Sequence, residues 1–284
     1  MDRRELLIGA AAAAPVLGVA TIGLALTLPP PDPVLDAVIA GDWRTPAAKA
    51  RDVWRHPAAS LRFWGLKPGA VVIDVDPGGG WWTEILAPYL ARTGGRYIAG
   101  EPDASDPEVG ERASKAAAAF QAKFADAKLY GAVTVVGFGA SSGPLAAPGT
   151  VDLVLVSRET HNWARRDGFT QTAFANFHSA LRPGGVLAIE DHRAPDGADP
   201  KKGDGYISEA WVIGEAKRAG FALAARSEIN ANPKDTKDHP FGVWTLPPTR
   251  QSAPTGQPPN PAFDHAKYDA IGESDRMTLK FVKV

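Results

Sequence analysis

Two short polar segments of the chain carry the residue types best suited to acid–base chemistry. They are ETHNW at residues 159–163 and Asp191-His192, and each lies just past an apolar run typical of a strand. Side chains at strand ends often carry function, because the rigid sheet positions them. Imidazole exchanges protons readily near neutral pH, so we predict His161, Asp191 and His192 as catalytic residues, with either histidine as the general base. The residues expected to contact the substrate here are Glu159, Asn162 and Trp163.

The same segments offer a rival chemistry, because carboxylate and imidazole groups can also bind a divalent metal ion. The candidate ligands would be Glu159, His161, Asp191, His192 and His239. No two histidines have the short helical spacing that is typical of a zinc site, so we predict no metal ligand. A serine hydrolase is disfavoured as well, since no G-x-S-x-G turn follows any predicted strand.

A third candidate feature is VIDVDPGGGWWTEIL, residues 72–86, where an apolar strand pattern meets three glycines and then a helix pattern. In open α/β sheets, ligands bind at the carboxyl ends of strands, and a glycine turn exposes backbone N–H groups there. The segment has neither the lysine of a phosphate loop nor the G-x-G-x-x-G spacing of a dinucleotide site. We predict that Gly78, Gly79 and Gly80 contact a cofactor. Of Trp81 and Trp82, we expect one, and choose Trp82, to cover the cofactor or to line the substrate pocket. The alternative is that it packs on the preceding helix.

The elements that must position these residues follow from the pattern of residues 66–284. Short runs rich in valine, isoleucine and leucine alternate with helical segments, which predicts a doubly wound, mostly parallel sheet with helices on both faces. Residues 33–65 have a helical pattern and are expected to pack on this core. Residues 230–276 form a proline-rich insertion without periodicity, and its aromatic residues favour an ordered excursion.

Composition limits the classes of partner. The 31 basic and 32 acidic residues give a net charge of −1, so we expect no nucleic-acid binding. The chain has no cysteine, which excludes disulfides, thiolate metal sites and a cysteine nucleophile. The oligomeric state is left open by the sequence.

Residues 1–32 have the character of a targeting segment, with Arg3-Arg4 in a short charged head, an apolar stretch and a proline-rich end. The arginine pair resembles a twin-arginine export signal. A membrane anchor is the alternative, because residues 6–28 reach the roughly 20 residues needed to span a bilayer. We therefore expect a protein that is periplasmic, or anchored by this segment alone and facing the periplasm.

The chain resembles the class I S-adenosylmethionine-dependent methyltransferases. The family turn D/E-x-G-x-G-x-G is matched by Asp74-Val75-Asp76-Pro77-Gly78-Gly79-Gly80, except that Asp76 replaces the first glycine. VDLVLVS resembles the family's fourth strand, and LRPGGVLAIED resembles its turn into the fifth strand. The segments PGGGWWTEILAPYL, ETHNW, EDH and NPKDTKDHPFG are similar to a narrower group of exported bacterial predicted methyltransferases. The resemblance implies a Rossmann-like, seven-stranded sheet that is closed by a C-terminal antiparallel hairpin.

The resemblance also implies roles for three acids. Asp74 would orient the glycine turn or hold the methionine amine through water, and Glu101 would bind the ribose hydroxyls. Asp76 would take over the amine contact or cap the following helix. If Asp76 instead blocks the cofactor, the fold serves another purpose.

Two functions follow from these expectations. The first is an S-adenosylmethionine-dependent methyltransferase that acts on a small-molecule or peptidyl acceptor, with a histidine removing the acceptor's proton. The second is a non-catalytic, methyltransferase-like binding protein of the cell envelope with an altered cofactor pocket.

Overall fold

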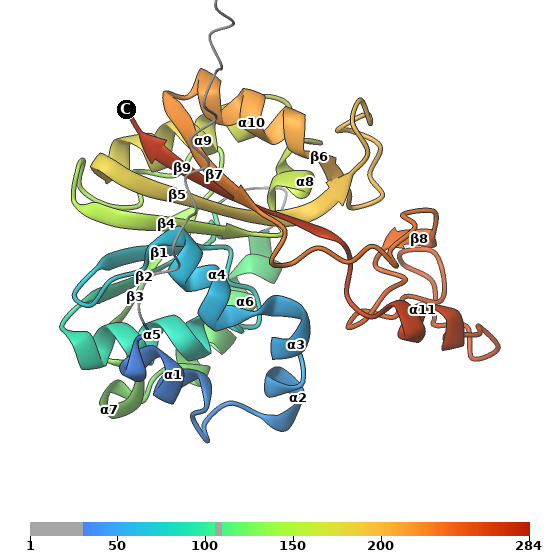
Figure 1. The fold of residues 1–284 in the computed structure, drawn as a ribbon, viewed down its shortest axis with the longest axis horizontal. Coiled ribbons are helices and arrows are strands. Elements are labelled where there is room, and N and C mark those ends of the chain that lie inside the picture. The colour runs from blue at the N-terminus through green and yellow to red at the C-terminus, as the bar shows by residue number, and fades with distance from the viewer. Residues whose placement is uncertain (1–30, 106–109) are drawn as a thin grey trace, which may run out of the picture.

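The fold is organised around one central, mostly parallel sheet, as the computed structural model of residues 31–105 and 110–284 shows (Figure 1). The strand order is β3-β2-β1-β4-β5-β9-β7, and a short β6 pairs with the end of β5. The strands are β1 Val71–Val75, β2 Arg96–Pro102, β3 Val133–Phe138, β4 Val151–Ser157, β5 Leu181–Ala194, β6 Ile207–Ser208, β7 Phe221–Ser227 and β9 Arg276–Lys283. The predicted export signal or anchor lies outside the described residues, apart from positions 31 and 32.

This topology confirms the predicted fold class. Strands β1 to β5 pair in parallel, whereas β9 runs antiparallel to both β5 and β7 and so closes the sheet as the predicted C-terminal hairpin. Two details differ from the prediction. The two-residue β6 is an eighth strand, and β5 begins at Leu181, inside the predicted turn, because Leu181 already pairs with Val151 before the register shifts.

Helices cover both faces of the sheet, and their packing follows the alternation of side chains along the strands. In β1, Val72 packs with α5 residues on one face, whereas Ile73 and Val75 pack with α9 residues on the other. Asp74 shares the face of Val72, which places its carboxyl group under α5. The main helices are α5 Thr83–Thr93 and α6 Gly110–Lys123 on one face and α9 Phe169–Ala180 and α10 Glu209–Arg218 on the other, with short α7 Ala127–Tyr130 and α8 Thr160–Trp163 (Figure 1).

Between residue 31 and β1, the structure describes four short helices. They are α1 Pro33–Ile39, α2 Pro46–Lys49, α3 Asp52–Arg55 and α4 Pro57–Trp64. Asp32 caps α1 and accepts a hydrogen bond from Tyr89 Oη at 2.6 Å, which fixes the start of α1 on α5. Trp64 is fully buried, and its Nε1 donates to the carbonyl of Leu279 in β9 at 3.1 Å. The helical segment is therefore joined both to α5 and to β9 of the sheet.

Between β7 and β9 the chain makes a long excursion that carries β8 Pro240–Val243 and α11 Ala266–Ile271, drawn in dark orange and red (Figure 1). Its first turn is held by the buried Asp235, which accepts hydrogen bonds from Tyr206 Oη at 3.0 Å and from the backbone N–H of Asp275 at 2.8 Å. These bonds tie the start of the excursion to its end. None of the described helices combines the length and the apolar character needed to cross a bilayer.

Candidate functional site

The main cavity of the described residues has a volume of about 850 Å³ and opens at the carboxyl ends of β1, β4 and β5. Its walls come from the glycine turn after β1, the loop after β4, the α2–α3 segment and the excursion. The lining includes Arg51, Arg55, Asp76, Gly78, Gly79, Trp81, Lys123, Arg158, Glu159, His161, Asn162, His192, Trp244 and Glu273. This position matches the general rule for ligand sites in open α/β sheets.

The glycine turn exposes its backbone to this cavity. Gly78 has φ +56, and an added Cβ at Gly78 or Gly79 would meet no atom within 4 Å, so both residues border open space. Gly80 differs, because φ is +78 and an added Cβ would lie 2.3 Å from the ring of Phe124. The first two glycines thus leave room for a ligand, whereas Gly80 is required for packing.

Four carboxyl groups gather beside this turn, and we call Asp74, Asp76, Glu101 and Glu159 the acidic cluster. Burial raises the pKa of Asp74 to about 7, although Tyr97 Oη donates a hydrogen bond to it at 2.8 Å. Burial also raises the pKa of Asp76 to about 6, and burial together with the charge of Asp76 raises that of Glu101 to about 7. Each acid therefore lies close to its titration point at neutral pH.

The remaining acid, Glu159, has its pKa raised well above the ordinary value by burial and by the charge of Asp76, while Asn162 Nδ2 donates to it at 3.0 Å. Glu101 Oε1 is buried and accepts no hydrogen bond from the described residues. No member of the acidic cluster forms an ion pair with a described residue. A ligand that brings hydroxyl donors and positive charge would satisfy this cluster.

His161 and Asp191 form a buried dyad at the ends of β4 and β5. His161 Nδ1 lies 2.7 Å from Asp191 Oδ1, and the backbone N–H groups of His161 and His192 donate to the same carboxylate at 3.1 and 2.8 Å. The hydroxyl of Thr160 donates to it as well. Asp191 thus holds the proton of His161 on Nδ1, which leaves Nε2 as an acceptor on the cavity side.

His192 lies next to the dyad, with its ring centroid 5.1 Å from that of His161 and its Nδ1 2.5 Å from Ser274 Oγ. Burial and the neighbouring His161 lower the pKa of His192 well below its ordinary value, so its ring is neutral. Ligand atoms of His161, Asp191 and His192 lie within 4.8 Å of one another, a spacing compatible with a metal ion. The four hydrogen bonds that Asp191 already accepts favour acid–base chemistry. His239 is not part of the group and pairs with Asp235 at 2.8 Å.

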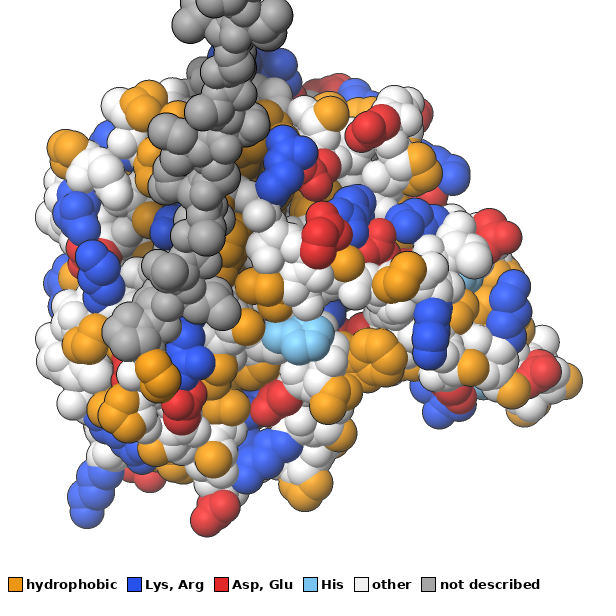
Figure 2. Space-filling view, in the orientation of Figure 1, with side chains coloured by type: hydrophobic (Ala, Val, Ile, Leu, Met, Phe, Trp, Pro, Cys, Tyr) orange, Lys and Arg blue, Asp and Glu red, His pale blue; other side chains and the backbone are white. Residues whose placement is uncertain are grey.

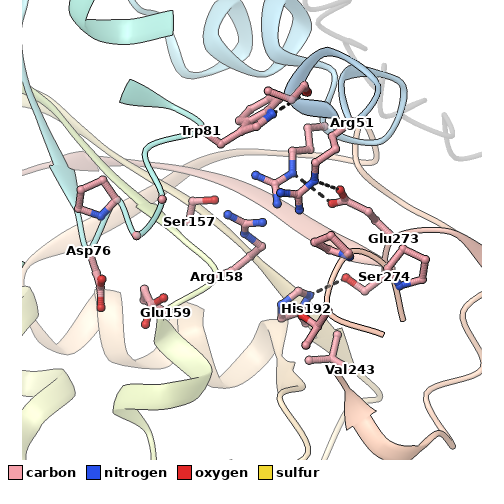
Figure 3. A pocket seen from close by; sticks show the side chains of 18 of the residues that line it. Arg51, Asp76, Trp81, Ser157, Arg158, Glu159, His192, Val243, Glu273 and Ser274 are labelled. Atoms are coloured by element: carbon pink, nitrogen blue, oxygen red, sulfur yellow. Dashed lines mark hydrogen bonds and ion pairs between the residues drawn. The ribbon is translucent and has the colours of Figure 1, made fainter. Parts of the chain in front are cut away.

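The structure adds a basic wall that the sequence analysis did not identify. We call Arg51, Arg55 and Arg158 the basic cluster; all three line the cavity (Figure 3). Arg51 Nε and Arg55 Nε share Glu273, at 2.6 and 3.1 Å, and the Arg55 guanidinium lies 4.7 Å from the centre of a Trp81 ring. The one available signal in the sequence was the four-residue spacing of Arg51 and Arg55, which places both on one side of a helix.

Several predicted site residues lie behind the cavity wall. Trp82 is buried and donates from Nε1 to Ser157 Oγ at 3.1 Å, whereas Trp81 lines the cavity and donates to the carbonyl of Ala48 at 2.9 Å. Trp163 packs in the core against Phe138, with ring centroids 5.5 Å apart. Also outside the cavity lining are Asp74, Gly80, Glu101 and Asp191. The cavity brings together Asp76, Gly78, Gly79, Glu159, His161, Asn162 and His192.

No family model matches the chain. No curated protein matches it either. Among solved structures, the chain is similar to an S-adenosylmethionine-dependent methyltransferase from Aquifex aeolicus, with a TM-score of 0.51 and 19% identity over 85% of this chain and 95% of that one. It is also similar to the [4+2]-cyclase SpnF, with a TM-score of 0.50 and 16% identity over 88% of this chain and 91% of that one. The chain therefore has the class I methyltransferase fold, and a cyclase has a similar fold.

Proposed function

We propose that the protein is an S-adenosylmethionine-dependent methyltransferase that acts on a small-molecule or peptidyl acceptor. One observation carries the proposal: a single cavity brings an open glycine turn and two members of the acidic cluster, Asp76 and Glu159, together with His161 of the His–Asp dyad, at the strand ends where this fold binds ligands. We further propose that the protein acts in the periplasm, or is anchored so that it faces the periplasm. This proposal is based on residues 1–32, which resemble a twin-arginine signal.

The residues beside the glycine turn fit this cofactor. Glu101 has a buried oxygen without a hydrogen bond from the described residues, which suits the paired hydroxyls of a ribose. The carboxyl groups of Asp76 and Glu159 suit the ammonium and sulfonium charges, and the open faces of Gly78 and Gly79 leave space beside them. When bound, the cofactor would supply an electrophilic methyl group.

The chain's own contribution is to take a proton from the acceptor. Asp191 keeps the His161 proton on Nδ1, so Nε2 is available to accept a proton from an O–H or N–H group in the cavity. The same carboxylate stabilises the imidazolium that results. His192 stays neutral beside it, and its contact with Ser274 connects the dyad to the end of the excursion.

Calorimetry on the full chain tests the proposal with S-adenosylmethionine and S-adenosylhomocysteine as ligands. We expect micromolar binding of both, and Glu101→Gln should weaken it about tenfold or more, since a buried charged acceptor is lost. Glu111→Gln is the matched control, because that acid is exposed on α6 and pairs with Lys115. Absence of heat at millimolar ligand would contradict the methyltransferase and favour the non-catalytic binding protein.

A further inference from the structure

We propose that the methyl acceptor carries an anionic group, a carboxylate or a phosphate, and that the basic cluster binds it. This inference rests on the proposed function and names the substrate class of the same cavity. In Figure 3, Arg51 and Arg158 lie toward Glu273 and Ser274, whereas Asp76 and Glu159 lie on the other side of the cavity. One cavity therefore offers separate places for a cationic and an anionic ligand group.

Arg158 is the member best placed to contact such a ligand. Its guanidinium forms no hydrogen bond with any described residue, and its Nε is buried without a partner there. The residue has φ +65, a left-handed conformation that is uncommon for a residue with a Cβ, and its side chain points into the cavity (Figure 3). A guanidinium offers five N–H donors in a planar fork that matches carboxylate and phosphate oxygens.

Arg51 and Arg55 add charge beside it. Arg51 uses Nε for Glu273 and keeps its terminal nitrogens free of hydrogen bonds with the described residues. Arg55 is 1% exposed, and both of its terminal nitrogens are buried without a partner there. We therefore expect Arg51 and Arg158 to contact the anion directly. Arg55, whose side chain is almost fully buried, adds positive charge beside them.

The charges in this region do not balance. Three guanidinium groups, those of Arg51, Arg55 and Arg276, pair with Glu273, and Arg276 also pairs with Glu190. The guanidinium of Arg158, the fourth of this region, forms no ion pair with a described residue. Arginine cannot relieve the imbalance by losing a proton, so the excess positive charge persists at every physiological pH. On the face drawn in Figure 2, basic and acidic side chains are interspersed, so this face carries no extended basic surface.

The surroundings of the arginines indicate what the anionic group is attached to. Trp81, Val243, Trp244, Pro247 and Pro248 line the same cavity and give it flat, apolar surfaces, and Trp81 lies directly against Arg55 of the basic cluster. A small molecule with an apolar or aromatic body would pack there while its acid group meets Arg158. Benzoate and phenyl phosphate are simple probes of this chemistry, and benzamide is their neutral counterpart.

The test titrates these three probes into the full chain, with and without S-adenosylhomocysteine. We expect benzoate or phenyl phosphate to bind at least about tenfold more tightly than benzamide, and Arg158→Gln to remove that difference. The tighter of the two acids tells which anionic group the acceptor carries. Arg92→Gln is the control, because Arg92 also lies over a tryptophan, 4.9 Å from a Trp43 ring, but outside the cavity lining.

Two outcomes would overturn the inference. The first is that neither acid binds better than benzamide at millimolar concentration. The second is that Arg158→Gln weakens S-adenosylhomocysteine but not 5′-methylthioadenosine, which lacks the amino-acid part, because the arginines would then hold the cofactor's carboxylate. Arg51→Gln repeats the test if Arg158→Gln does not fold. The titrations without cofactor separate a failure of this inference from a failure of the proposed function.

Discussion

The two charged walls of the cavity deal with like charge in opposite ways. The acidic cluster has no ion pair with a described residue, and three of its acids have pKa values near neutrality, about 6 for Asp76 and about 7 for Asp74 and Glu101. Repulsion there is relieved when a proton binds. The arginines of the basic cluster cannot lose a proton in this way. Arg51 and Arg55 share Glu273, and the cluster retains N–H donors without a partner among the described residues. One wall therefore has an adjustable charge, and the other has a permanent charge.

The largest expected effect comes from the residue between the two walls. His161→Ala should lower the rate of methyl transfer about 10²- to 10⁴-fold, because the general base is lost. Affinities for S-adenosylhomocysteine and benzoate should change little. Calorimetry and a transfer assay measure the two effects separately, with His265→Ala on the excursion as control. Equal loss of cofactor affinity would mean that His161 has a structural role.

Glu273→Gln tests the permanent charge. Removing the carboxylate shared by Arg51, Arg55 and Arg276 should lower the free energy of unfolding by about 3 kcal/mol, as is typical for breaking a buried ion pair. Benzoate should nevertheless bind more tightly, since the wall becomes more positive. Urea unfolding and benzoate titration measure both quantities.

Glu228→Gln is the control for this variant, because Glu228 pairs with Arg193 but is 66% exposed in its side chain. Weaker benzoate binding to a folded Glu273→Gln protein would contradict the idea of excess positive charge at this wall.

Glu101→Gln tests the adjustable charge in the absence of ligand. The folded-state pKa of about 7 exceeds the ordinary 4.5, so the folded state holds more protons than the unfolded state between these values, and stability falls as pH rises through them. The variant removes this penalty. It should be on the order of 1–3 kcal/mol more stable than the parent at about pH 8 and nearly equal to it at about pH 4.

Thermal or urea unfolding at the two pH values measures this difference. Glu111→Gln, on the exposed surface of α6, should show no comparable pH dependence. A Glu101→Gln protein that is less stable than the parent at the higher pH would show that the carboxylate is satisfied in the ligand-free chain.

The smallest effect concerns the pH dependence of binding itself. S-adenosylmethionine should bind a few-fold more tightly as pH rises from about 6 to about 8, because its positive charge favours the ionised acids. S-adenosylhomocysteine lacks the sulfonium charge and should respond less. The protein should continue to bind benzoate more tightly than benzamide throughout this pH range. Calorimetry in two buffers of different ionisation enthalpy measures the protons released; no release with S-adenosylmethionine would contradict the assignment.

The two walls also differ in how far the sequence could predict them. The sheet and the glycine turn depend on local patterns: the alternation of apolar runs with helices, and three glycines after a strand. The dyad was accessible too, since His161 and Asp191 both lie at strand ends that the sheet brings together. The spacing of Arg51 and Arg55 could be seen in the sequence, but their contact with Glu273 and their position beside Arg158 join distant segments, which no local pattern predicts.

Tryptophans 81 and 82 illustrate the remaining limit. Both directly precede α5, and successive residues with helical backbone differ by about 100° in direction, so the side chain that meets the cavity depends on how this turn and α5 are rotated. The sequence does not fix that rotation, and the structure places Trp81 in the cavity lining and Trp82 in the core. The path of residues 230–276 was inaccessible for a similar reason, because buried polar bonds such as Tyr206 to Asp235, and not hydrophobic periodicity, hold it.

The position of β9 has a consequence for when the cavity can form during synthesis of the chain. This strand lies between β5 and β7, not at an edge, and Glu273, which joins Arg51 across 222 residues and Arg55 across 218, lies three residues before it. Until Glu273 and β9 have been synthesised, the sheet lacks an inner strand and the arginines lack their shared carboxylate. The cavity is therefore incomplete before that point, and its formation depends on contacts of high sequence separation.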